Sequence, residues 1–188
     1  MAYVFITGIP AAGKSFIAEK IAKEHGIMHV DVDSFRVEME KDPKLELWVN
    51  YFWNKDEAKY FEKSCEERWK DIVDQSEAFW PFFSNRMREI MQSNSSAIFE
   101  GVNLLPHIVS RDFQFPGVVL LGESFETIFG RNKQDPRWGK TEDLQKKEAE
   151  SFFFCEGEQY KKEGEQYGWK AFSDPSEAER KLLKIMGL

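Results

Sequence analysis

Residues 8–15, GIPAAGKS, have the residue types and spacing of a phosphate-binding loop, G-x-x-x-x-G-K-[ST]. Its glycines let backbone N–H groups turn inward around phosphate oxygens, and a following helix presents its positive dipole end to the same charge. Lys14 would reach the β- and γ-phosphates of ATP, and the Ser15 hydroxyl is a hard oxygen ligand suited to magnesium. A glycine turn that only caps a helix would not explain the Lys-Ser pair. The predicted ATP contacts are Gly8, Ala11, Ala12, Gly13, Lys14, Ser15 and Phe16.

A first carboxylate, Asp33, lies just after the apolar run that ends at Val32. In an open sheet of parallel strands the carboxyl ends of the strands face the ligand crevice. We therefore predict that Asp33 is the general base, which accepts the proton of an attacking hydroxyl group, or a ligand of the acceptor. The alternative is that Asp33 or Ser34 caps the next helix, and both roles can coexist.

A second carboxylate, Glu100, ends the apolar run 97–99. Proteins with this phosphate loop usually place there the acid that organises magnesium, and the usual residue is Asp. Glu is longer, so a direct contact, a contact through water and a role as base all stay open. We predict Ser15 and Glu100 as the residues that hold Mg²⁺, against the alternative of a surface Glu at a strand end.

Two arginines follow the apolar run 118–121 at the distance where a lid would hinge. Arg131 and Arg137 would be brought in when a lid over about 131–147 closes, and would stabilise the charge on the transferring phosphoryl group while water leaves. The alternative is that they are solvated, or interact only with a helix dipole.

Alternating strands and helices must position these groups. A helical pattern follows the phosphate loop and stops at Gly26, and a last helix is predicted from Asp174-Pro175 to about Met186. Short apolar strands separated by helical segments predict an α/β fold with a parallel sheet. The predicted strands are Tyr3–Ile6, Met28–Val32, Ala97–Phe99 and Val118–Leu121, with a weak fifth at Trp169–Phe172.

Between the second and third strands, residues 43–93 form a helix-rich and unusually aromatic insertion that is too long for a simple crossover. Most of its aromatic side chains are expected in the core. If some of them line a pocket, they would flank the acceptor, where Arg36 and Arg86 could hold an anionic group.

The composition limits the classes of protein. A chain of 188 residues with 41% hydrophobic and 31% charged residues fits one soluble globular domain, residues 1–188. Its formal charge of −7 argues against nucleic acid or an anionic membrane as the main partner. The N-terminus is no signal peptide, and no run approaches a membrane span. Cys65 and Cys155 are expected to be reduced thiols in a cytoplasmic protein.

Three segments together resemble the small-molecule branch of the P-loop kinases: 8–15, 33–36 (DSFR) and 99–106 (FEGVNLLP). The pieces Asp-Ser-Phe and Phe-Glu-Gly are similar to those of uridine kinases, and Asp-Ser-x-Arg and Glu-Gly-Val-x-Leu-x-Pro are nearer to those of 2-phosphoglycerate kinases. The resemblance implies a three-layer fold with a five-stranded parallel sheet in the order 2-3-1-4-5, a helical acceptor-binding insertion and an arginine-bearing lid. Asn103 stands where the phosphoglycerate enzymes tend to carry His.

The predicted function is ATP- and magnesium-dependent phosphoryl transfer to a hydroxyl group of a small molecule, either an anionic metabolite or a nucleoside or nucleotide. Besides Asp33, the predicted acceptor contacts are Arg36, Arg86 and Asn103. The alternatives are a nucleotide switch, which needs hydrolysis rather than an acceptor pocket, and a toxin-like kinase that acts on a nucleotide sugar. The sequence leaves both a monomer and a homodimer open.

Overall fold

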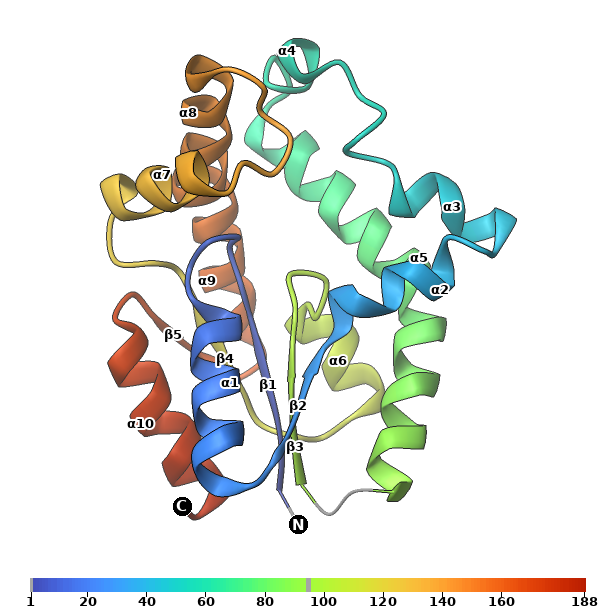
Figure 1. The fold of residues 1–188 in the computed structure, drawn as a ribbon, viewed down its shortest axis with the longest axis vertical. Helices are drawn as coiled ribbons and strands as arrows, with labels where there is room; N and C mark the ends of the chain where they lie inside the picture. Colours follow the sequence, from blue (N-terminus) through green and yellow to red (C-terminus); the bar gives the residue numbers. More distant parts are fainter. Residues whose placement is uncertain (1, 94–95) are drawn as a thin grey trace.

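A computed structural model describes residues 2–93 and 96–188 and shows one five-stranded parallel sheet in the order β2-β3-β1-β4-β5 (Figure 1). The predicted class and strand order are confirmed, including the weak fifth strand. The strands are β1 (Ala2–Gly8), β2 (Met28–Asp31), β3 (Ser96–Glu100), β4 (Gly117–Leu120) and β5 (Lys170–Phe172).

The central strand is β1, which pairs with β3 on one side and β4 on the other. Its residues Val4, Phe5 and Ile6 are fully buried because helices cover both faces of the sheet. Ile6 of β1 lies opposite Glu100 of β3 in the strand register. The phosphate loop, which follows β1, and Glu100 therefore lie at the same edge of the sheet, where the strands end.

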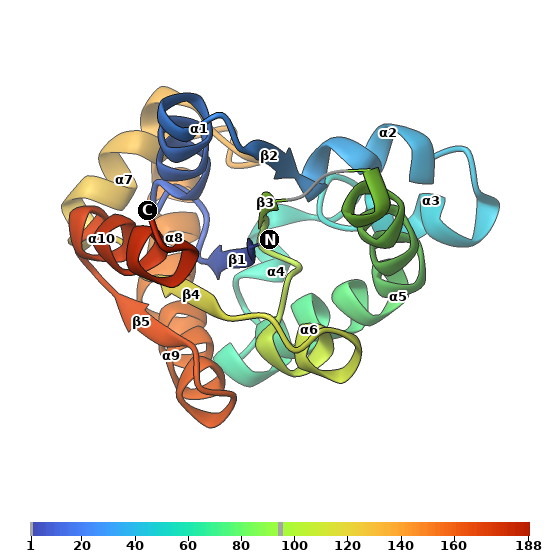
Figure 2. The same cartoon turned by 90° about the horizontal axis from the view of Figure 1, so that it is seen from below.

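Helices form the two outer layers. Figure 2 shows α1 (Lys14–His25) and α10 (Pro175–Met186) on one face, and α6 (Pro106–Asp112) and α9 (Gly157–Gln166) on the other. The predicted helix ends are confirmed: Gly26 ends α1 in the left-handed conformation that favours glycine, and Asp174 caps α10 by accepting from Ser176 N.

The segment expected as an insertion contains α3, α4 and the 29-residue helix α5, after a short 3₁₀ turn and α2 at the end of β2. Its aromatic residues Phe79, Trp80 and Phe83 are buried in the core, as predicted. The bounds are Val32–Phe35 for the 3₁₀ turn, Arg36–Met39 for α2, Pro43–Val49 for α3, Glu57–Tyr60 for α4 and Cys65–Ser93 for α5.

After β4, the helix α7 (Phe125–Gln134) and a loop lead into α8 (Glu142–Glu150). A π-helical turn, Ser151–Glu156, continues α8 directly into α9. Figure 1 shows α4, α7 and α8 at the end of the molecule opposite the two termini, which is the end toward which the strands run. No helix within the described ranges is both long and apolar enough to cross a membrane.

The expectation of reduced thiols is wrong. Cys65, in the first turn of α5, forms a disulfide with Cys155 in the π-helical turn, and their Cα atoms lie 5.2 Å apart. Their separation of 90 residues along the chain made them look unrelated. Packing of α5 against the π-helical turn brings them together, and the bond ties the insertion to the segment after α8.

Candidate active site

The phosphate loop is built around glycines that no larger residue could replace without strain. Gly8 has φ 129°, and a Cβ there would lie 1.9 Å from the carbonyl oxygen of Leu120. Gly13, at the N-terminus of α1, has φ 95°, and Ala11 adopts the left-handed region with φ 59°. The loop therefore keeps an open curve directly before the positive end of α1.

Lys14 is the buried cation of this loop. Its Nζ donates to the carbonyl oxygens of Ile9 at 2.8 Å and Gly8 at 3.1 Å, so the side chain folds back over the loop. Burial lowers the pKa of Lys14 to about 8, while the negative charges of Glu100 and Asp33 act in the opposite direction. The ammonium group thus lies where phosphate oxygens would replace carbonyl oxygens as its partners.

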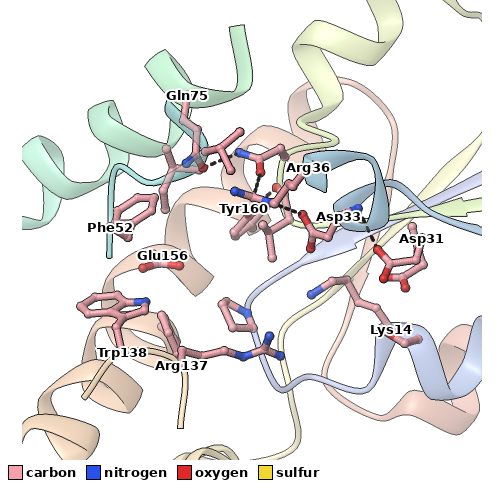
Figure 3. A pocket seen from close by; sticks show the side chains of 18 of the residues that line it. Lys14, Asp31, Asp33, Arg36, Phe52, Gln75, Arg137, Trp138, Glu156 and Tyr160 are labelled. Atoms are coloured by element: carbon pink, nitrogen blue, oxygen red, sulfur yellow. Dashed lines mark hydrogen bonds and ion pairs between the residues drawn. The ribbon is translucent and has the colours of Figure 1, made fainter. Parts of the chain in front are cut away.

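One cavity of about 330 Å³ joins the phosphate loop to the aromatic insertion and to the loop after α7. Figure 3 shows Lys14 and Asp31 at one end of it and Phe52, Trp138 and Glu156 at the other. It is lined by Pro10, Lys14, Ser15, Asp31, Asp33, Arg36, Val49, Phe52, Trp53, Ile72, Gln75, Glu100, Val102, Asn103, Arg137, Trp138, Phe152, Glu156 and Tyr160.

Half of the predicted site residues meet there. The structure brings together Lys14, Ser15, Asp33, Arg36, Glu100, Asn103 and Arg137 around the cavity, from four separate parts of the chain. Gly8, Ala11, Ala12 and Gly13 belong to the phosphate loop itself, and three others lie elsewhere. Arg86, on α5, is in exposed ion pairs with Glu38 of α2 and Glu89 of α5, Phe16 is 72% exposed, and Arg131 contacts the phosphate loop at Ala11 O.

The turn after β2 aims Asp33 into the cavity. Asp31 accepts from the backbone N–H of Asp33 at 2.8 Å and so caps the 3₁₀ turn, which leaves the Asp33 carboxylate available. The helix cap considered in the sequence is thus provided by Asp31. Burial and the neighbouring carboxylates Asp33 and Glu100 raise the pKa of Asp31.

Glu100 is almost fully buried at the end of β3. His29, on the neighbouring strand β2, places Nε2 3.4 Å from Glu100 Oε1, and this hydrogen bond raises the pKa of the imidazole. The alternative of a surface glutamate is excluded by this burial. The histidine contact was missed because the alignment of β2 with β3 is not visible in the sequence.

A polar network fixes the wall beside Asp33. Arg36 donates from Nε to Asp33 at 3.1 Å and from Nη2 to Asn103 Oδ1 at 2.7 Å. Asn103, which is fully buried, donates in turn to Gln75 Oε1 at 3.1 Å and to Ser76 Oγ at 2.8 Å on α5. The insertion and the third strand are therefore joined through the side chains that surround the predicted base.

The two arginines predicted for a lid take separate positions. Arg131 Nη1 donates to Ala11 O of the phosphate loop at 2.9 Å and does not line the cavity, whereas Arg137 does. The loop that carries Arg137 is fixed by buried Glu148, which accepts from Asn132 Nδ2 at 2.7 Å and Trp138 N at 3.1 Å. Burial raises the pKa of Glu148.

Several lining residues gave no signal in the sequence. Glu156 comes after three phenylalanines and Cys155, a pattern typical of a packed helix, yet its side chain lines the cavity. Trp138, in the loop between α7 and α8, stacks on Phe52 and Phe61, with ring centroids 5.9 and 5.3 Å apart. His107, just beyond the segment 99–106, contacts Glu163 through Nδ1 at 2.7 Å and lies outside the cavity lining.

The donor set suits magnesium rather than a metal held by protein alone. Within residues 2–93 and 96–188, no group of three or more His, Cys, Asp or Glu side chains is arranged to hold an ion. Magnesium keeps several waters and is usually bound through one or two protein oxygens plus substrate phosphates. Ser15 in the first turn of α1 and Glu100 at the end of β3 fit that pattern.

No protein-family profile matches the sequence, and no curated protein matches it. Solved structures match along the full chain. The shikimate kinase from Bacteroides thetaiotaomicron covers 100% of this chain with 99% of its own, at 15% identity and a TM-score of 0.55. The deoxyadenosine kinase from M. mycoides, solved with bound dATP, covers 100% of both chains at 18% identity and a TM-score of 0.52.

The chain has the fold of the small-molecule P-loop kinases. A gluconokinase from Sinorhizobium meliloti matches 99% of the chain with 91% of its own, at 13% identity and a TM-score of 0.50. The expected P-loop kinase fold is therefore confirmed. At identities of 13 to 18% the likeness concerns the fold. The reaction that this chain catalyses depends on the residues of its own cavity.

Proposed function

We propose that this chain is a magnesium-dependent kinase that transfers the γ-phosphoryl group of ATP to a hydroxyl group of a small molecule. The observation that carries the proposal is a single cavity in which the phosphate-loop residues Lys14 and Ser15 face Asp33. The aromatic far end of the same cavity provides space for an acceptor. A switch that only hydrolyses nucleotide has no use for such a chamber.

Each residue has a defined part in the step. The acceptor oxygen attacks the γ-phosphorus, the bond from that phosphorus to the β–γ bridging oxygen breaks, and ADP leaves with the electron pair. Asp33 accepts the proton of the attacking hydroxyl group. Lys14 and Arg137 stabilise the negative charge on the transferring oxygens. Magnesium, held by Ser15 and Glu100, would neutralise charge on the β- and γ-phosphates.

The cavity also bears on the size of the acceptor. A volume of about 330 Å³ lies near the lower limit of typical ligand pockets, which favours a small acceptor over a nucleotide sugar. The fold supports the same reaction class, because the matching structures are kinases of small molecules. We further propose that residues 1–188 act as one domain with an insertion at about 43–93 and a lid at about 131–147.

The test is ATP consumption with magnesium across a library of small hydroxylated compounds, with mass spectrometry to detect the phosphorylated product. Lys14→Ala is the matched control, because the loop alone cannot neutralise the phosphate oxygens, while the fold should survive. We expect one chemical class of acceptor to be phosphorylated by the native chain and not by the variant. ATP hydrolysis at a rate that no compound changes, or equal turnover by the folded variant, would overturn the proposal.

A further inference from the structure

The strongest unexplained feature of the cavity is the carboxyl group of Glu156. It lies at the junction of the π-helical turn and α9, is 5% exposed, and lines the cavity wall at the end remote from Lys14 (Figure 3). The step proposed above makes no use of it. A buried carboxyl group is costly unless it is paired, so its presence at this position needs a reason.

Within the described part of the chain, Glu156 has no ion-pair partner. Its side-chain hydrogen bond comes from Ser151 Oγ at 3.4 Å, and the cations Arg68 and Lys14 influence it only through space. The Arg68 guanidinium donates instead to the carbonyl oxygens of Phe61 and Lys63 and to the sulfur of Cys155. Burial raises the pKa of Glu156 to about 7, as expected for a carboxyl group without a partner.

The walls around this carboxyl group are aromatic and apolar. Phe52 and Trp53 come from the insertion, Trp138 from the lid, and Phe152 and Tyr160 from the segment that carries Glu156. The negative faces of aromatic rings attract a cation, most strongly when it is removed from water. A buried acid among aromatic rings therefore has the charge and the surroundings that suit an organic ammonium group.

The cationic side chains that line the cavity already have partners or parts in the proposed reaction. Arg36 is paired with Asp33 and Asn103, and Lys14 and Arg137 are assigned to the phosphates. Among the described lining residues, Glu156 is the charged group at the aromatic end that has no part in that reaction. The cationic side chains that could hold an anionic acceptor are thus engaged, and Arg86, expected for that purpose, lies elsewhere.

We propose that the acceptor is an amino alcohol, whose hydroxyl group faces Asp33 and whose ammonium group binds Glu156 among the rings of Phe52, Trp138 and Tyr160. This inference rests on the proposed function, but the ammonium site can be measured without turnover. Glu156 is then the residue that selects amine-bearing acceptors over neutral compounds of the same shape. The hydroxyl oxygen of the amino alcohol, rather than its nitrogen, attacks the γ-phosphorus and takes the phosphoryl group.

The test compares benzylamine with benzyl alcohol, which have nearly the same shape and differ in charge. Binding to the full-length chain, with its disulfide intact and saturated with a non-hydrolysable ATP analogue and magnesium, is measured by calorimetry near pH 8. We expect benzylamine to bind at least tenfold more tightly than benzyl alcohol. Glu156→Gln should abolish this preference, because it keeps the shape and loses the charge.

Two further variants keep the result interpretable. Glu163→Gln on α9, which pairs with His107 and does not line the cavity, should keep the full preference. If Glu156→Gln fails to fold, Glu156→Asp, which retains the charge on a shorter side chain, should weaken the preference without removing it. Equal binding of the two probes by the native chain, or a preference that survives in Glu156→Gln, would overturn the proposal.

Turnover separates this inference from the proposed function. A panel of amino alcohols and matched diols is offered with ATP and magnesium, and phosphorylated products are detected. If only diols are phosphorylated and benzylamine is not bound selectively, the ammonium site is contradicted while the proposed kinase activity is supported. If benzylamine is bound selectively and no compound is phosphorylated, the kinase activity is contradicted while the ammonium site is supported.

Discussion

Asp33 and Arg36 face each other across one turn of the chain after β2, with Arg36 Nε 3.1 Å from Asp33 Oδ1. Because Arg36 is held by Asn103 as well, the pair is fixed from the third strand and from α5. The proposed base is thereby oriented toward the cavity, and its own charge is balanced. The same contact leaves Arg36 less free to hold an anionic acceptor.

Replacing Asp33 tests the base directly. Asp33→Asn should slow phosphoryl transfer by roughly 10² to 10⁴, since that is the usual contribution of a general base. ATP affinity, measured by calorimetry, should stay near the native value because shape is kept. Asp74→Asn, an exposed residue on α5, is the control. A collapse of ATP affinity with the rate at saturation intact would make Asp33 a structural or magnesium residue.

Replacing each of the two arginines predicted for the lid should change a different kinetic constant, because Arg131 contacts the phosphate loop and Arg137 lines the cavity. Arg137→Ala should lower kcat by about tenfold or more with little change in acceptor KM, since its contact strengthens as charge develops in the transition state. Arg131→Ala should mainly raise the KM for ATP, because its partner is the phosphate-loop carbonyl of Ala11.

Steady-state kinetics on the two single variants make this comparison, with exposed Arg180→Ala as the control. The stretch from 131 to 147 should also gain protection from hydrogen exchange when ATP analogue and acceptor are both bound. A rise in acceptor KM alone for Arg137→Ala would place this guanidinium on the acceptor. Unchanged kinetics in both variants would make the segment an ordinary solvated one.

The Cys65–Cys155 disulfide should stabilise the chain by closing a long loop. The double variant Cys65→Ser/Cys155→Ser should lose about 2 to 4 kcal/mol of unfolding free energy, the usual contribution of such a bond. Urea denaturation measures the loss. Native protein that is kept reduced should show the same urea midpoint as the variant. The disulfide assignment would be contradicted if oxidised native protein and the variant had the same urea midpoint. Free thiols in the oxidised native protein would also contradict it.

Glu156 should make the protein less stable as pH rises. Its pKa is raised from 4.5 to about 7 in the folded chain, so between these values the folded state binds a proton that the unfolded state has released. The free energy of unfolding contributed by this group is therefore greatest below about pH 4.5 and falls through pH 7. Glu156→Gln removes this loss.

Urea denaturation near pH 5 and pH 8 should show Glu156→Gln gaining stability over the native chain at the higher pH, by up to a few kcal/mol. The other charged groups that act on Glu156 are Arg68 of α5, Lys14 of α1 and Glu148 of α8, and all three are present in both proteins. A stability difference that does not change with pH would show that the carboxyl group is already ionised in the folded state.

Local sequence patterns were enough to predict the strands of a parallel sheet and the phosphate loop, whereas the strand order was implied by the resemblance to small-molecule P-loop kinases. Short apolar runs each ended at a glycine or carboxylate, and the constraint that parallel strands point their carboxyl ends to one edge placed Lys14, Asp33 and Glu100 together. Such features depend on residues close in sequence or on general rules of sheet topology. Arg86, predicted as an acceptor contact, does not line the cavity, because residue type alone does not say which face of α5 turns toward it.

The sequence by itself determined the fold class and the end of the molecule at which phosphate is bound, because a glycine loop between a strand and a helix has few alternative structures. Only the tertiary structure decided which residues form the far end of the cavity. Packing of α5 against the π-helical turn joined Cys65 to Cys155, and the loop between α7 and α8 placed Trp138 on Phe52. These contacts join residues far apart in the chain, so the position of Glu156 in the cavity follows from how helices pack and from no local pattern.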